Sequence, residues 1–220
     1  MLLNQYHDRM IAKKVLLGSL GFVALFLTAN FFGDNVNAAP DPTFKPILGG
    51  IGNRRPRGMV MRLPSVLRLY DYKNERVTVY PEVRSIGGGL SITFNTERDC
   101  KARFCYFGRI NAYQSLAAMK SSNPFDYDLI SSPMRKPWTR IQPNRVCGIV
   151  SRKIIALNNS IKAVAVEHDT CGSASGVTNS VVWEQDKTVF VAQLGLGDIN
   201  NINVAKSMAN EPPTTFPIPY

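Results

Sequence analysis

Residues 181–208 of this chain, VVWEQDKTVFVAQLGLGDINNINVAKSM, decide its fold. The first half holds two apolar runs, rich in valine and aromatic residues, on either side of the polar tripeptide Gln185-Asp186-Lys187, which is the pattern of a β-hairpin. The second half predicts a helix that Asp198 caps and Pro212-Pro213 ends, with apolar residues at Ile199, Ile202, Ala205 and Met208. Because a hairpin buries only one face and a helix of about 10 residues is marginal alone, we expect the two to pack against each other.

Strand patterns continue on the N-terminal side of this hairpin. Val66–Tyr72 and Arg76–Tyr80 flank a turn composition and predict a second hairpin, and further strands are predicted at 90–94, 105–110, 146–150, 154–157 and 163–167. Helix is scarce, with about two turns at Gln114–Lys120 besides the C-terminal helix. The predicted fold class is therefore α+β and β-dominated: a twisted, mostly antiparallel sheet with one C-terminal helix packed on it.

The first 38 residues have the pattern of an export signal. Three basic residues, Arg9, Lys13 and Lys14, precede an apolar run of 19 residues from Val15 to Gly33. Small residues at the end of this segment predict cleavage after Ala38, and the alternative cut after Ala39 is less favourable because it places proline at the scissile bond. Removal of residues 1–38 takes away three basic and two acidic residues, so the net charge changes from +10 to +9.

An uncleaved membrane anchor is the alternative for the same segment. The apolar run approaches the ~20 residues that span a bilayer, and the basic residues before it would keep the N-terminus in the cytoplasm. Under either interpretation residues 41–220 lie outside the cytoplasm, in the periplasm or beyond the cell.

The rest of the chain divides into three predicted parts. Residues 39–65 are rich in proline, glycine and arginine and predict a linker, 66–211 predict a single β-rich domain, and 212–220 predict an extended proline-rich tail. The linker holds Arg54, Arg55 and Arg57, which could bind an anionic partner or simply keep the linker solvated.

The cysteines are four in number: Cys100, Cys105, Cys147 and Cys171. An oxidising compartment would pair them, and of the three possible pairings we favour Cys100–Cys105 with Cys147–Cys171. The same residues together with His168 could in principle bind zinc, and His168 close to Cys171 could activate a thiol. The cysteine spacing is unlike that of structural zinc sites, so structural disulfides are the preferred interpretation and no metal or cofactor is predicted.

A candidate binding surface follows in residues 121–144, where periodicity fails. Arg135, Lys136, Trp138 and Arg140 combine cations with an aromatic ring, a composition that can stack on sugars or lipid headgroups. The alternative is that the aromatic side chains close one end of the sheet as part of the core.

Catalytic motifs are absent from the sequence. No Gly-x-Ser-x-Gly pattern surrounds a serine, no pair of carboxylates has a recognised spacing, and His168 is the single histidine after the export segment. We therefore name no catalytic residue.

The chain resembles a set of uncharacterised exported proteins of cyanobacteria over roughly residues 64–213. The resemblance lies in Cys100-x4-Cys105 followed by Phe107-Gly108-Arg109-Ile110, in Val182-Trp183-x6-Phe190-x-Val-Ala, and in Val204-Ala205-Lys206-Ser207-Met208. It implies an envelope-directed β-rich domain and supplies no catalytic residues.

The expected function is that of an exported envelope or periplasmic protein that is not an enzyme and binds an anionic envelope polymer or membrane surface through its basic, aromatic loop. A hydrolase of envelope polymers and a membrane-anchored partner of a larger complex are the alternatives. We do not expect the chain to bind nucleic acid.

Overall fold

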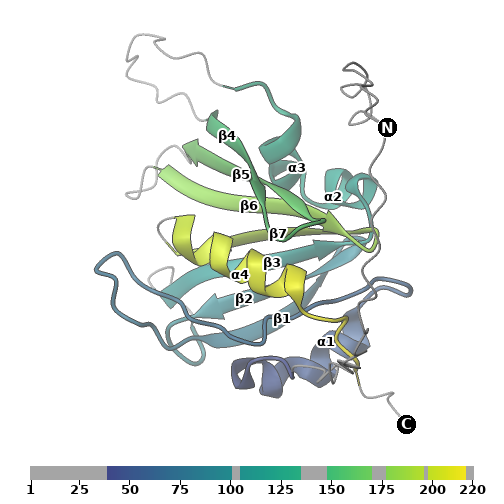
Figure 1. Ribbon diagram of the computed structural model, residues 1–220. Coiled ribbons are helices and arrows are strands. Elements are labelled where there is room, and N and C mark those ends of the chain that lie inside the picture. The colour runs from purple at the N-terminus through teal and green to yellow at the C-terminus, as the bar shows by residue number, and fades with distance from the viewer. Residues whose placement is uncertain (1–38, 101–104, 135–147, 170–176, 196–197, 217–220) are drawn as a thin grey trace, which may run out of the picture. The chain divides into compact units, whose positions relative to one another are not determined.

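The computed structural model describes residues 39–100, 105–134, 148–169, 177–195 and 198–216. Within these residues seven strands form one antiparallel sheet with the order β1-β2-β3-β7-β6-β5-β4 (Figure 1). The strands are β1 (Tyr80–Ile86), β2 (Gly89–Asn95), β3 (Tyr106–Tyr113), β4 (Gly148–Ala156), β5 (Lys162–Asp169), β6 (Val177–Gln185) and β7 (Thr188–Leu194).

Helices cover both faces of the sheet. They are the 3-10 helix η1 (Pro42–Ile47) and the α-helices α1 (Leu48–Arg54), α2 (Leu116–Ser122), α3 (Pro124–Ser131) and α4 (Asp198–Asn210). Helix α4 packs on one face together with the N-terminal segment, and α2 and α3 pack on the other. The predicted class, a β-dominated α+β fold with a C-terminal helix on an antiparallel sheet, is confirmed.

The predicted central hairpin and helix are present as β6, β7 and α4. Asp186 and Lys187 form the turn with φ angles of 51° and 63°, as a two-residue hairpin turn requires. Trp183 and Phe190 are cross-strand partners whose rings stack 5.1 Å apart. Their large apolar surfaces therefore fix the register of the hairpin.

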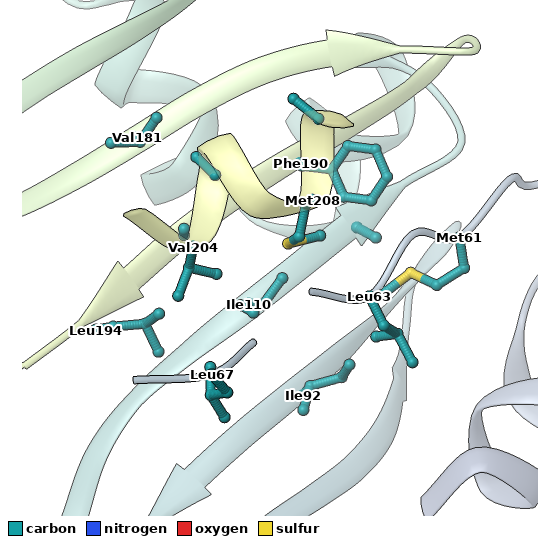
Figure 2. Close-up of a cluster of buried hydrophobic side chains, with 14 of the residues drawn as sticks. Met61, Leu63, Leu67, Ile92, Ile110, Val181, Phe190, Leu194, Val204 and Met208 are labelled. Atoms are coloured by element: carbon teal, nitrogen blue, oxygen red, sulfur yellow. The ribbon is translucent and has the colours of Figure 1, made fainter. Parts of the chain in front are cut away.

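The main core lies between the sheet and α4. Alternate residues of the central strands face it, including Ile110 of β3 and Phe190 of β7. Figure 2 shows Val204 and Met208 of α4 among these side chains, next to Leu63 from the N-terminal segment.

Residues 39–65 are part of this core, so the prediction of a linker is wrong. Phe44 and Ile51 are fully buried, and three further apolar residues, Met59, Met61 and Leu63, are almost completely buried. The Asp41 carboxylate holds the segment in place by accepting hydrogen bonds from the backbone N–H of Thr43, at 2.9 Å, and of Leu67, at 2.8 Å. The sequence does not reveal this burial, because proline and glycine interrupt the apolar pattern and the buried side chains pack against residues distant in the sequence.

The predicted proline-rich tail has no regular secondary structure over residues 212–216, as expected of an extended segment, but these residues pack against the domain. The N–H of Thr214 donates to the carbonyl of Met61, and the N–H of Leu63 donates to the hydroxyl of Thr214. Phe216 lies against the main core with the Arg55 guanidinium over its ring, 5.1 Å from the centroid.

The predicted strands differ from the observed ones in three places. The hairpin expected at 66–80 is reduced to one bridge, Tyr70–Arg76, and the N–H of Tyr70 donates to the side chain of Asn200. Residues 148–150 and 154–156, which come from two separately predicted strands, belong to the single strand β4. Strand β1 and helix α3 were not predicted, since Pro81 and Pro124 lie within the first two residues of each.

Candidate functional site

Strand direction gathers most of the long connections at one end of the sheet. Because neighbouring strands are antiparallel, the end of one strand lies beside the start of the next. The strand termini at this end, on the left in Figure 1, are Tyr80, Asn95, Tyr106, Gly148, Asp169, Val177 and Leu194. We call it the loop end.

Large apolar side chains are exposed at the loop end. Tyr106, the first residue of β3, is 47% exposed, and Ile199, at the start of α4, is 56% exposed. Tyr72 is 72% exposed and belongs to a turn whose Tyr70 exchanges backbone–side-chain hydrogen bonds with Asn200 of α4. These three side chains therefore lie at the same end of the sheet.

Two further exposed side chains come from α3 and from the segment that follows it. Phe125 of α3 contacts the ring of His168, close to the end of β5, and Met134 forms a parallel bridge with Ile149 at the start of β4. Both keep about half of their surface exposed. Exposed apolar groups concentrated in this way are typical of an interaction surface.

The predicted basic residues fall into two groups. Arg135, Lys136, Trp138 and Arg140 lie outside the described residues. Arg54, Arg55 and Arg57 end or follow α1, and the carbonyl of Arg57 accepts a hydrogen bond from Gln114, which follows the last residue of β3. The second group is therefore at the opposite end of the sheet from the loop end.

A buried carboxylate holds α3 against the sheet near the loop end. Asp126 is fully buried and pairs with Arg109 at 2.9 Å. Its second oxygen accepts hydrogen bonds from the amide of Asn111 at 2.6 Å and from the hydroxyl of Tyr113 at 2.7 Å. The charge is thus compensated on both oxygens, and burial together with the Asp126 charge raises the pKa of Tyr113.

The last turn of α3 is held by a second cation. Arg152 of β4 donates to the carbonyls of Leu129 at 2.6 Å and Asp128 at 3.1 Å. A guanidinium at the carbonyl end of a helix also interacts favourably with the helix dipole. Helix α3 is therefore attached to the sheet by a charged contact at each of its ends.

His168 is buried beside this cluster. Its side chain lies within 3.2 Å of the hydroxyl oxygens of Ser180 and Thr178, and the edge of the Phe125 ring covers it. Burial lowers the pKa of His168 and the Arg109 charge lowers it further, against the opposing effect of nearby carboxylates, so the ring is neutral at pH 7. Because Ser180 is 1% exposed, a Ser180–His168 pair has no access to substrate.

The predicted Cys100–Cys105 disulfide is present and closes the β2–β3 connection at the loop end, with the two Cα atoms 5.8 Å apart. Cys147 and Cys171 lie outside the described residues, so their pairing stays a prediction, as does the hypothesis of a thiol activated by His168. No group of three or more His, Cys, Asp or Glu side chains suited to a metal ion occurs in the part of the chain that the structure describes.

The Asp126 network was not predicted from the sequence, although a signal for it exists. Arg109, Asn111 and Tyr113 recur with a period of two and therefore point to one face of β3. Polar residues at three successive positions of one face predict a buried polar partner across the layer. That partner, Asp126, lies in a helix that the sequence pattern did not predict.

Comparison with protein-family models, curated proteins and solved structures finds no match for this chain. Across the described residues, no helix combines the length and apolar character needed to cross a membrane.

Replacing Asp126 by alanine tests the buried carboxylate. We expect Asp126→Ala to lower the free energy of unfolding by about 3 kcal/mol, because it leaves Arg109 without its partner and removes the carboxylate that accepts from Asn111 and Tyr113. The measurement is chemical denaturation followed by tryptophan fluorescence. Asp128→Ala, on the exposed side of the same helix, is the matched control, and an equal loss in both variants would contradict the role assigned to Asp126.

His168 is expected to make stability fall at mildly acidic pH. Its pKa in the folded state is below its ordinary value of 6.5, so the unfolded chain binds more protons as the pH falls through 6.5 and the free energy of unfolding decreases. In His168→Gln that decrease between pH 7 and about pH 5 should be smaller. Denaturation at a series of pH values measures it, and identical slopes in the two proteins would show that His168 is not buried in the neutral form.

Proposed function

We propose that this is an exported, non-catalytic protein of the cell envelope whose loop end binds an anionic surface. The observation that carries the proposal is the exposure of Tyr72, Tyr106 and Ile199 at the end of the sheet from which the most basic connections leave. By sequence, connections 101–104 and 135–147 contain six lysine and arginine residues and no aspartate or glutamate. They account for most of the net charge of +9 expected after cleavage.

The combination of apolar and basic residues suits a lipid headgroup layer or an acidic polymer. Aromatic and aliphatic side chains enter the interfacial region of a bilayer, and each cation near an anionic bilayer contributes about 1 kcal/mol. An acidic polysaccharide would use the same cations, with aromatic rings stacking on its sugars. An anionic lipid surface and an acidic polysaccharide therefore both fit the apolar and basic residues of the loop end.

Export is supported by the pattern of residues 1–38 and by the Cys100–Cys105 disulfide, since disulfides persist in oxidising compartments. An uncleaved anchor would leave the domain on the same side of the membrane. The resemblance to exported cyanobacterial proteins, which rests on the sequence motifs alone, predicts the same location. The hydrolase alternative has no support from the described residues, because His168 and Asp126 are each at most 2% exposed.

Vesicle binding tests the proposal. We expect the purified protein to co-sediment with vesicles that contain phosphatidylglycerol, to bind phosphatidylcholine vesicles at least tenfold more weakly, and to be released by salt. Tyr72→Ser combined with Ile199→Ser should weaken binding, because both side chains would otherwise enter the headgroup layer.

Leu116→Ser is the matched control, since Leu116 is 42% exposed at the opposite end of the sheet. Salt-sensitive retention on an acidic polysaccharide, with no binding to either vesicle, would assign the surface to a polymer instead. Binding to neither, even at low ionic strength, would overturn the proposal.

A further inference from the structure

The two edge strands of the sheet, β1 and β4, differ in what packs against them. Edge strand β1 has a proline at its second position and lies beside η1 and α1; a Cβ added at Gly50 of α1 would come within 2.8 Å of Val83. Edge strand β4, nine residues long, packs mainly against its sheet neighbour β5. An open edge of this length presents a row of backbone donors and acceptors.

The first residues of β4 already accept a partner on the open side. Ile149 pairs with His168 of β5 on one side and forms a parallel bridge with Met134 on the other. From Val150 to Ala156, no described residue pairs with that side of the strand. Among the described residues, the free side of β4 therefore pairs with another backbone at Ile149 alone.

Side chains on β4 define what kind of strand would fit. Ile154 is 73% exposed and Val150 is 42% exposed, which is unusual for apolar residues of an ordered strand. Lys153 is exposed and, among the described residues, forms no ion pair. Ile154 pairs with Val164 on the face of α3, and Lys153 pairs with Ala165 on the opposite face.

We propose that residues 150–156 of β4 bind an extended segment of another protein by strand addition, and that this segment alternates apolar and acidic residues. Main-chain hydrogen bonds supply the binding, and side chains supply the selectivity. The apolar residues of the partner cover Ile154 on the α3 face. Its acidic residues lie beside Lys153 on the opposite face.

Self-pairing of β4 with a second copy of the chain is disfavoured in its two central registers. Antiparallel pairing of β4 with itself about its central residue, Arg152, places two arginines opposite each other, and pairing about Lys153 places two lysines opposite each other. Like charges directly across a strand pair are destabilising. The surface is thus suited to an acidic heterologous strand, and it is separate from the exposed loop-end residues Tyr72, Tyr106 and Ile199.

Synthetic peptides of about eight residues provide the test. A fluorescent peptide of alternating Glu and Val should bind the full chain, as measured by anisotropy, and should slow amide hydrogen exchange at 150–156. A Lys/Val peptide should bind at least about tenfold more weakly because it opposes Lys153. The Glu/Val peptide methylated on alternate backbone nitrogens should not bind, because it lacks the required donors.

Variants of the protein complete the experiment. Lys153→Glu should weaken binding of the Glu/Val peptide about tenfold and strengthen that of the Lys/Val peptide, whereas Lys206→Glu, the same change on the exposed side of α4, should alter neither. Ile154→Thr keeps a β-branched residue and should also weaken binding. Equal affinity for both peptides, exchange protection outside β4, or dimerisation of the chain through β4 would each overturn the proposal.

Discussion

Antiparallel pairing of all seven strands is the constraint on which the other features depend. It places the β2–β3, β5–β6 and β7–α4 connections, and the start of β4, at one end of the sheet. Residues that are far apart in the sequence, such as Tyr72, Tyr106 and Ile199, are exposed together there as a result. The same topology leaves β4 at an edge, so the candidate binding end and the candidate strand-addition edge have a common origin.

Buried charged groups hold helix α3 against the sheet. Asp126 attaches α3 to Arg109, Asn111 and Tyr113, which are successive residues on the face of β3 that α3 covers. Arg152 holds the other end of that helix. A buried carboxylate of this kind is costly unless every oxygen is compensated, and here donors reach both oxygens. By positioning α3, the cluster also places the Phe125 ring against His168, whose pKa is lowered mainly by burial.

Strong local patterns could be predicted from the sequence, whereas tertiary contacts could not. The β6–β7 hairpin and α4 were predicted because apolar periodicity, the polar turn and the terminating prolines agree. The N-terminal segment was predicted as a linker because its glycines and prolines conceal Phe44 and Ile51, whose burial depends on distant partners such as Phe94. Asp126 was missed for the same reason, since its role comes from residues on β3.

The most direct test of the central claim is a hydrogen-exchange footprint of the protein bound to phosphatidylglycerol vesicles. If the loop end binds the vesicle, amides around Tyr72, Tyr106 and Ile199 exchange more slowly in its presence, whereas those around Leu116 and Arg57 do not change. Protection confined to the opposite end of the sheet, or none at the loop end, would contradict the assignment of the loop end as the binding surface.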